Sequence, residues 1–414
     1  MIRNLMATWN NYYYDEFIAM TRLAVLTSHP IQYQAPLFRY LAKQEGLNLK
    51  TFFCSDFGVT PKRDEQFGVT FSWDIPLLDG YEYEFLVNRA TDPGPQSSKG
   101  LYNPDADKKI LDFRPDAVLV HGYSSWTSRF VINQMFHHSI PLIFRGESNL
   151  LQPRPLHIRI VKEFYLRNLF RKISAFASIG QYNTEYYRHY GVSRDKIQLA
   201  PYTVDNDYFQ SRTVEARLEA ERLREELSIF ERTVILFSAK FIPKKRPLEL
   251  IDGFYRSGIS SDCVLVFAGD GEMKSLMEKR IAELGIVTSV IFLGFRNQSQ
   301  MPATYALGDL FVIPSSIEPW GLAVNEAMNL GLPIIASDMV SSARDLILQG
   351  ENGWVYPSGD IDRLAACLSE AASLGREGLG LKGLRSLKII VRWGIPETAA
   401  GILDALRCVT RAER

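Results

Sequence analysis

Two glutamates, Glu318 and Glu326, flank a turn in the last quarter of the chain, with seven residues between them. The apolar, β-branched residues 310–313 predict a buried parallel strand that stops at Pro314. Residues 321–330 then predict a helix. The turn therefore lies at the carboxyl end of a strand and at the beginning of a helix, which is where open α/β sheets bind ligands.

The free N–H groups and the positive dipole of such a helix terminus suit a phosphate. A carboxylate beside a phosphate would repel it, so we expect both glutamates to accept hydrogen bonds from hydroxyl groups instead. A ligand with phosphates between hydroxyl groups is a nucleotide sugar. Two solvated helix carboxylates are the alternative for a bare Glu-x7-Glu spacing, and the strand–turn–helix context favours the functional interpretation.

The segment EPWGLAVNEAM at residues 318–328, followed by GLPIIA at 331–336, resembles the retaining glycosyltransferases of glycosyltransferase family 4. The resemblance extends from about residue 234 to about residue 359 and is weaker in the first half of the chain. It implies an α/β protein with the GT-B architecture, in which two doubly wound Rossmann-like domains face each other across a cleft.

Short apolar strands alternate with helical stretches throughout the chain, as in parallel sheets. We predict strands at residues 23–28, 49–53, 117–120, 141–144, 175–179, 197–199, 234–239, 264–268, 290–293, 310–313, 333–336 and 354–356. The predicted organisation is a dispensable extension (1–19), an acceptor-side domain (20–208), a donor domain (209–390) and a C-terminal helix that crosses back to the first domain (391–414). We expect a linker near residues 205–212 and a mobile, glycine-rich segment at 373–383.

The resemblance assigns roles on the donor side. Lys240 and Lys245 would neutralise the diphosphate leaving group, whereas a solvated basic turn is the better interpretation for their neighbours Lys244 and Arg246. Glu326 would hold the ribose hydroxyls. Glu318 and the N–H groups of Gly321 and Leu322 would face the sugar and the phosphate. The loops with Gly271 and Phe295 match the family's nucleotide-contacting loops, although a plain strand-to-helix turn is the alternative for each.

These cations predict that the donor, a nucleoside diphosphate-sugar, is bound without a metal and that no cofactor is needed. Metal-dependent transferases of another fold place an Asp-x-Asp triplet just after a strand. The two such triplets here, at residues 105–107 and 205–207, follow no strand of the donor domain, and we interpret both as structural.

On the acceptor side the sequence departs from the family, because residues 28–36 (SHPIQYQAP) replace the usual Gly-Gly turn. His29 and Gln32 in this loop can still reach the cleft. Glu147 lies near the position of a family histidine and either orients acceptor or sugar hydroxyls or pairs with Arg145, two alternatives that we weigh equally. His121 ends another strand and is a second cleft candidate, a structural histidine being the alternative.

Net charge and composition limit the kinds of partner that we expect for this protein. The chain has 414 residues and a formal net charge of +0, so no global field recruits nucleic acid. Four dispersed cysteines fit a reducing compartment and predict a cytoplasmic protein.

In the predicted helix 156–172, one apolar arc (Ile158, Ile160, Val161, Phe164, Tyr165 and Leu169) suits packing on the sheet. Leu166 and Phe170 lie among Arg159, Lys162 and Arg167 on the other side, which predicts contact with an anionic membrane surface or burial under a loop.

We therefore expect an enzyme that moves a sugar from a nucleoside diphosphate-sugar to a hydroxyl acceptor with retention of configuration. A sugar or a lipid-linked glycan of a cell-surface polysaccharide is the expected acceptor. One alternative is a sugar-nucleotide epimerase of the same fold, which needs no acceptor. The other is a catalytically silent binding protein, which would not need both glutamates and both lysines.

Overall fold

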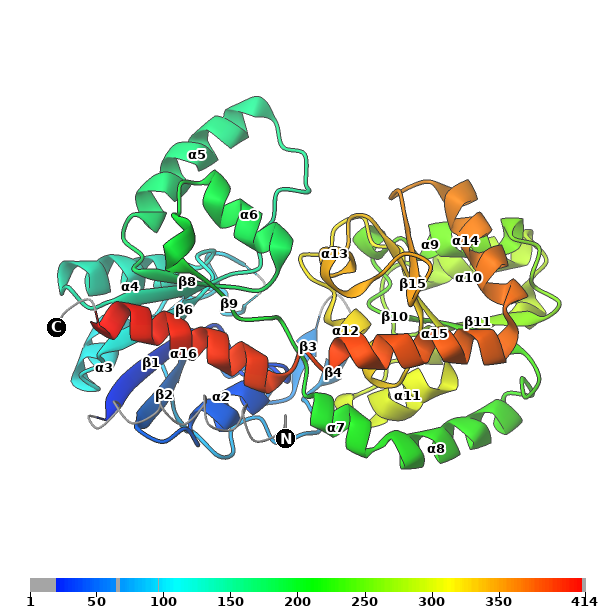
Figure 1. The fold of residues 1–414 in the computed structure, drawn as a ribbon, viewed down its shortest axis with the longest axis horizontal. Helices are drawn as coiled ribbons and strands as arrows, with labels where there is room; N and C mark the ends of the chain where they lie inside the picture. The colour runs from blue at the N-terminus through cyan, green and yellow to red at the C-terminus, as the bar shows by residue number, and fades with distance from the viewer. Residues whose placement is uncertain (1–19, 65–67, 96, 412–414) are drawn as a thin grey trace, which may run out of the picture.

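The structure is a computed structural model, in which residues 20–64, 68–95 and 97–411 are described. The predicted extension at residues 1–19 lies outside the described residues. Two parallel sheets, each covered by helices on both faces, make up the described chain (Figure 1). The predicted α/β fold class is thereby confirmed.

The first sheet has seven strands in the order β5-β2-β1-β6-β7-β8-β9. Their bounds are β1 Thr21–Thr27, β2 Leu47–Phe53, β5 Glu82–Phe85, β6 Ala117–His121, β7 Leu142–Arg145, β8 Ala175–Ser178 and β9 Ile197–Leu199. The strand order reverses between β1 and β6. The loops at the carboxyl ends of these two strands therefore open onto the ligand-binding crevice of the sheet.

The second sheet has six strands in the order β12-β11-β10-β13-β14-β15. Their bounds are β10 Thr233–Ser238, β11 Cys263–Ala268, β12 Val290–Gly294, β13 Leu310–Ile313, β14 Ile334–Ser337 and β15 Gly353–Tyr356. Here the order reverses between β10 and β13. The loop after β13 holds Glu318, and the loop after β10 holds Lys240 and Lys245, so the switch point brings the predicted donor residues together.

Helices connect the strands. Those of the first half are α2 Ala35–Leu41, α3 Ala106–Asp112, α4 Trp126–His137, α5 Leu156–Phe170, α6 Gln181–His189 and α7 Asn206–Ser211. The later ones are α8 Thr213–Glu226, α9 Pro247–Arg256, α10 Lys274–Glu283, α11 Met301–Leu307, α12 Leu322–Asn329, α13 Ala343–Leu346, α14 Ile361–Ser373, α15 Gly375–Ile390 and α16 Ile395–Arg411. Among the described residues, none of the helices combines the length and apolar character that crossing a membrane requires.

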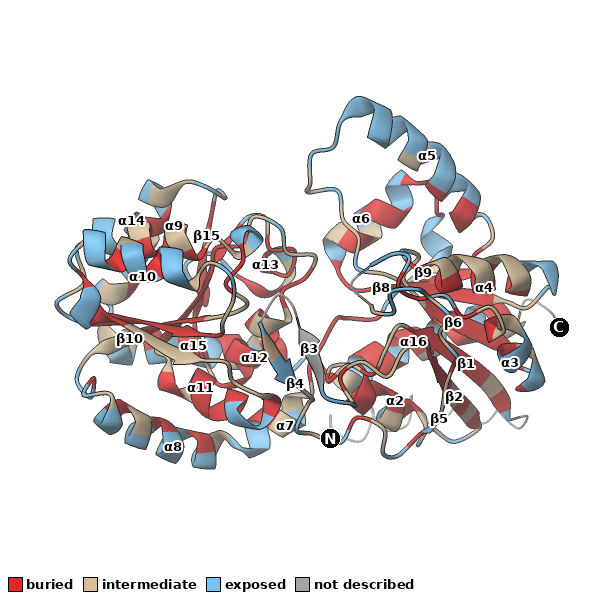
Figure 2. Cartoon of the chain, turned by 180° about the vertical axis from the view of Figure 1, so that it is seen from behind, coloured by how far each residue is buried: buried red, intermediate tan, exposed pale blue. Residues whose placement is uncertain are grey.

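The strands are buried on both faces, as their continuous apolar runs require. In β1, Leu23 and Val25 point into the core on one side of the first sheet, and Ala24 and Leu26 point into the core on the other. The second sheet shows the same alternation. Figure 2 shows both sheets as buried layers between partly exposed helices. All twelve predicted strands are present.

The short strands β3 (Lys62–Asp64) and β4 (Val69–Phe71) form an antiparallel pair that the sequence did not predict, and β5 was also missed. Burial explains the case of β5, because this edge strand has no fully buried residue and thus lacks the apolar run used to find the others. The predicted linker at residues 205–212 forms α7, which the Asp205 carboxylate caps by accepting from the backbone N–H of Tyr208 at 3.0 Å. The boundary between residues 208 and 209 stays a prediction.

The last helix, α16, lies against the first sheet although the preceding helix, α15, packs on the second (Figure 1). Its residues Ala399, Ile402 and Leu406 are fully buried in the core shared with β1 and α2. At the crossing point the Thr398 hydroxyl donates to the carbonyl of Pro201 at 2.6 Å. The chain leaves the first sheet near Pro201 and returns to it near Thr398, and this hydrogen bond joins the two connecting segments.

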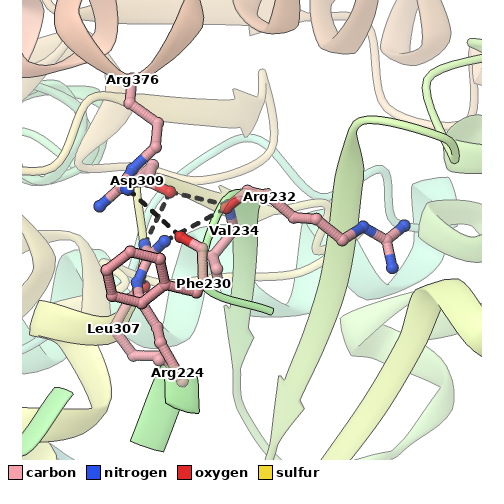
Figure 3. Close-up of polar contacts among 7 residues, drawn as sticks. All are labelled: Arg224, Phe230, Arg232, Val234, Leu307, Asp309 and Arg376. Atoms are coloured by element: carbon pink, nitrogen blue, oxygen red, sulfur yellow. Dashed lines mark hydrogen bonds and ion pairs between the residues drawn. The ribbon is translucent and has the colours of Figure 1, made fainter. Parts of the chain in front are cut away.

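A partly buried carboxylate, Asp309, fixes the end of the second sheet that lies opposite the loops of the switch point (Figure 3). It accepts from the Arg224 guanidinium at 2.7 Å and from the backbone N–H of Val234 at 2.8 Å. Arg376 of α15 donates to its other oxygen at 3.2 Å, and Arg224 of α8 also donates to the carbonyl of Leu307. Asp309 thus ties the beginnings of β10 and β13, the two strands whose other ends hold the predicted site, to the helices around them.

The helical-wheel prediction for residues 156–172 is wrong about which face packs. Leu166 and Phe170, for which membrane contact and burial under a loop were the two alternatives, are buried, with Phe170 only 4% exposed. Phe164, predicted to pack on the sheet, is 74% exposed. The reason is that only the second half of α5 reaches the aromatic core around Phe144 and Tyr187. The first two turns project past the sheet, and within the described residues their apolar side chains stay exposed (Figure 2).

The glycine-rich residues 373–383, predicted to be mobile, are also helical and belong to α14 and α15. Gly383 explains part of this composition. A Cβ atom there would lie 1.7 Å from the carbonyl oxygen of Gly331, so glycine allows α15 to approach the turn after α12. Close packing does not account for Gly375 and Gly380, because a Cβ atom at either position would meet nothing within 4 Å.

Candidate active site

The predicted donor residues Lys245 and Glu318 form an ion pair at the switch point of the second sheet. Lys245 lies in a short 3₁₀ turn after β10, and Glu318 lies between β13 and α12. Both side chains are largely buried, and the hydroxyl of Ser315 donates to the same Glu318 oxygen at 3.3 Å. The structure therefore places the two groups in direct contact, although the sequence assigned them to the sugar and to the diphosphate separately. Lys240, in the same loop, is half-buried.

The N-terminus of α12 lies directly after this pair. Gly321 precedes Leu322, the first residue of the helix, and has a positive φ of 97° that favours glycine. Neither a side-chain cap nor an acidic residue occupies the first turn of this helix. Its N–H groups and dipole thus keep the positive potential that an anion would meet.

Glu326 is buried inside the molecule, at 3% exposure. Its carboxylate accepts from the Tyr305 hydroxyl at 2.7 Å and from the Gln298 amide at 3.5 Å. The hydroxyl of Tyr33, which comes from the loop after β1 of the first sheet, also donates to it. Burial raises the pKa of Glu326 to about 7, and these three hydrogen bonds limit the rise.

A small cavity of about 140 Å³ lies beside Glu326. Its lining includes Phe295, one of the predicted nucleotide-contacting residues, and Gln32, which the sequence placed on the acceptor side. Gly271 is not among the lining residues. A Cβ atom there would lie 2.6 Å from the carbonyl oxygen of Phe241, so Gly271 serves close packing between two loops, while Gly269 lines the cavity.

A larger pocket of about 440 Å³ lies at the carboxyl ends of the first sheet's strands and is lined by His121, Glu147 and, from the second half, Pro319. Glu147 accepts from the Tyr202 hydroxyl at 2.6 Å. Arg145 instead donates to the carbonyls of Ala200, at 2.7 Å, and Pro201. Of the two alternatives for Glu147, the pairing with Arg145 is therefore not formed among the described contacts, and Glu147 lines the pocket while bonded to Tyr202.

The groups around Glu147 shift its pKa in opposite directions. Burial raises the pKa of Glu147, the Tyr202 hydrogen bond and Arg145 lower it, and Glu318 across the cleft raises it again. The carboxylates of the two halves therefore lie within electrostatic reach of each other. Burial and the charge of Arg145 lower the pKa of His121 to about 3, so this imidazole is neutral at pH 7.

The two other acceptor-side candidates, His121 and His29, lie in different surroundings, and only His121 lines the larger pocket. The Nδ1 atom of His121 lies 3.2 Å from the amide nitrogen of Gln34, which fixes the ring, while its Nε2 atom is buried and has no hydrogen-bond partner. His29 lies 2.9 Å from the Ser28 hydroxyl, and its ring meets the edge of Phe57 at 5.3 Å. It lines neither the small cavity nor the larger pocket.

Several residues of the site were missed from the sequence, namely Tyr33, Trp73, Arg296, Gln298 and Tyr305 around Glu326, and Tyr202 beside Glu147. Neither Tyr33 nor Tyr305 belongs to a local motif. They meet Glu326 only because the loop after β1 and helix α11 converge on α12. The sequence offered one indication that Tyr33 belongs to the site, namely its position in the loop that follows the first predicted strand.

Comparison with known proteins agrees with this geometry. Residues 219–377 match the model of the family Glycosyl transferases group 1. The chain is 33% identical over 155 residues to the alpha-D-kanosaminyltransferase of Streptomyces kanamyceticus, a match covering 37% of this chain and 39% of that protein. It is 25% identical over 233 residues to a GDP-mannose-dependent alpha-(1-6)-phosphatidylinositol monomannoside mannosyltransferase of Mycolicibacterium smegmatis, covering 51% of this chain and 59% of that one.

Among solved structures, Anabaena HepE in complex with UDP superposes with a TM-score of 0.70 at 19% identity, over 94% of this chain and 99% of that one. Residues 219–377 thus belong to the glycosyl transferases group 1 family, and the chain as a whole has the GT-B fold. The predicted resemblance is confirmed. The matches to the two curated relatives span 39% and 59% of their length, and the family match lies in the half that holds the second sheet.

The raised pKa of Glu326 predicts a dependence of stability on pH. Between its ordinary value of 4.5 and about 7, the folded protein binds a proton that the unfolded chain releases. The free energy of unfolding should therefore fall as pH rises through this window and be insensitive to Glu326 outside it. The Glu326→Gln variant lacks this titration, so the parent should lose stability relative to it between pH 5 and pH 8.

Urea unfolding of both proteins at the two pH values measures this difference. Glu283→Gln, at an exposed helix carboxylate, serves as the matched control and should show no such change. A stability difference between parent and Glu326→Gln that is the same at both pH values would contradict the assignment.

Proposed function

We propose that this protein is a glycosyltransferase that moves a sugar from a nucleoside diphosphate-sugar to a hydroxyl acceptor with retention of configuration. One observation carries the proposal. The segment from Pro319 to Glu326 contributes to both cavities, since Pro319 lines the larger pocket and Glu326 lines the smaller one. A donor bound along this segment would present its sugar to an acceptor in the first half.

The chain's residues have distinct tasks in this proposal. Glu326 accepts from the ribose hydroxyls in the small cavity. Lys240, Lys245 and the N-terminus of α12 stabilise the negative charge that develops on the diphosphate. Glu318 faces the sugar and holds Lys245 in position. Glu147, fixed by Tyr202, accepts from a hydroxyl in the larger pocket.

In the transfer step the bond between the anomeric carbon and the leaving phosphate oxygen breaks. The acceptor oxygen bonds to the same face of that carbon, and its proton passes to the leaving phosphate oxygen. No separate base is needed, so catalysis rests on orientation and on electrostatic stabilisation. This reaction uses only groups of the donor, the acceptor and the residues above, without a metal.

The relatives support a nucleotide-sugar donor and name two nucleotides, GDP-mannose for the mycobacterial mannosyltransferase and UDP for the HepE complex. Measuring the melting temperature with a panel of nucleotide sugars identifies the donor, because a ligand that binds only the folded state stabilises it. Incubation of that donor without acceptor then separates the candidates. A transferase hydrolyses it slowly, an epimerase changes its sugar, and a silent binding protein does neither.

We predict that Lys245→Ala lowers the turnover number by about 10²-fold or more, the scale of losing one donor that stabilises developing negative charge. It should also reduce stabilisation by the nucleotide sugar. Lys279→Ala, at an exposed lysine on α10, is the matched control and should behave like the parent. Turnover of Lys245→Ala close to the parent's would overturn the role of this lysine.

We also propose that the protein is cytoplasmic and rests on an anionic membrane, where a lipid-linked acceptor would be presented. The supporting surface is the exposed part of α5, where Leu156, Val161 and Phe164 stand beside Arg159. The double variant Val161→Asp plus Phe164→Asp should lose sedimentation with phosphatidylglycerol vesicles. Leu218→Asp on α8, also exposed, should keep it. A parent protein that stays in the supernatant at low salt would contradict this proposal.

A further inference from the structure

The larger pocket contains more positive charge than the proposed transfer uses. Three cations line it, Arg145, Arg154 and Lys162, against a single carboxylate, Glu147. Arg145 is 4% exposed and is held by two backbone carbonyls and the ring of Tyr202. The charge that remains to be explained belongs to Arg154 and Lys162.

Arg154 lies in the loop just before α5, and Lys162 lies in the second turn of the helix. In the part of the chain that the structure describes, neither lies within ion-pair distance of a carboxylate. Arg167, on the same helix, is paired with Glu163 at 2.6 Å, so acidic residues are within reach of α5 elsewhere but not here. The first turn of α5 also has no acidic residue.

The position of Lys162 is fixed. Its ammonium group lies 4.9 Å from the centre of the Tyr186 ring and 5.9 Å from that of Tyr190. Burial and the nearby charge of Arg154 lower its pKa. Lys162 and the exposed Arg154, two like charges that repel each other, thus line one side of a cavity, an arrangement that an anion with two negative charges would relieve.

We propose that Arg154 and Lys162 form a binding site for a phosphate group carried by the acceptor. This inference rests on the proposed function, because it places the phosphate in the pocket where Glu147 accepts from the acceptor hydroxyl. At about 440 Å³ the pocket has room for a sugar in addition to a phosphate. The guanidinium provides a planar pair of donors and the ammonium a point charge, both suited to phosphate oxygens. A phosphate or diphosphate ester therefore binds with its charged group against α5 and its sugar toward β7.

The test uses isopentenyl diphosphate, a small soluble diphosphate ester, as the probe. Its binding to the full-length protein is measured by calorimetry with the nucleoside diphosphate that stabilises the protein present in excess, so that the donor phosphate site is filled. Arg154→Ala and Lys162→Met should each weaken probe binding by about tenfold or more, the scale of one charge-assisted hydrogen bond. Lys162→Met keeps the apolar stem that packs on the tyrosines, and Lys162→Arg should retain binding.

Arg159→Ala is the matched control, since Arg159 is an exposed cation of the same helix that does not line the pocket. It should bind the probe as the parent does. Equal weakening by Arg159→Ala and Arg154→Ala would reduce the effect to general surface charge and overturn the site. Displacement of the probe by excess nucleoside diphosphate would place it in the donor site and overturn it as well.

Two further arms identify the source of the phosphate. Inorganic pyrophosphate that binds with the same dependence on Arg154 and Lys162 supports a site for the phosphate itself. Attachment to phosphatidylglycerol vesicles that depends on these residues, without binding of either soluble probe, would assign the pair to membrane headgroups and overturn the acceptor site. If no nucleotide sugar stabilises the protein, the proposed transferase function fails, while probe binding that depends on Arg154 and Lys162 would still establish the phosphate site.

Discussion

The ion pair between Lys245 and Glu318 is the interaction on which the site depends. It joins the loop after β10 to the loop after β13, the two central strands of the second sheet, at the point where the strand order reverses. Behind it, Asp309 ties the opposite ends of the same two strands to α8 and α15. The central strand pair is therefore fixed at both ends, and α12 begins directly from this fixed base.

The pair also determines what a donor must do when it binds. Each charge compensates the other, so neither is left as an isolated buried ion. In the proposed function, a diphosphate would compete with Glu318 for the ammonium of Lys245, which would release the carboxylate toward hydroxyls of the sugar. The positive N-terminus of α12 assists this exchange because no side chain occupies it. Charge compensation within the protein and the proposed recognition of the donor thus involve the same two residues.

Much of this arrangement was predictable from sequence because it is local. Buried parallel strands have continuous apolar runs, and all twelve strands predicted on that basis are present. The residues from Glu318 to Glu326, together with the apolar strand before them, were sufficient to predict a strand–turn–helix site. Tyr33, Tyr305 and Tyr202 could not be found in the same way, because each contacts its carboxylate through a convergence of elements distant in sequence. The prediction of the packing face of α5 was wrong for a related reason. A helical wheel gives every turn the same weight, whereas only the second half of this helix contacts a hydrophobic core.

Two glutamates with different surroundings suggest two different tasks. Glu326 is enclosed and bonded to Tyr33, Tyr305 and Gln298, whereas Glu318 is paired with a lysine at the opening between the halves. Calorimetry with the bare nucleoside diphosphate separates them most directly. If Glu326 accepts from the ribose and Glu318 serves the sugar, Glu326→Gln weakens binding of the bare nucleotide. Glu318→Gln does not weaken it, because this change only removes the carboxylate that competes with the diphosphate for Lys245. Equal losses in both variants would contradict this division of tasks.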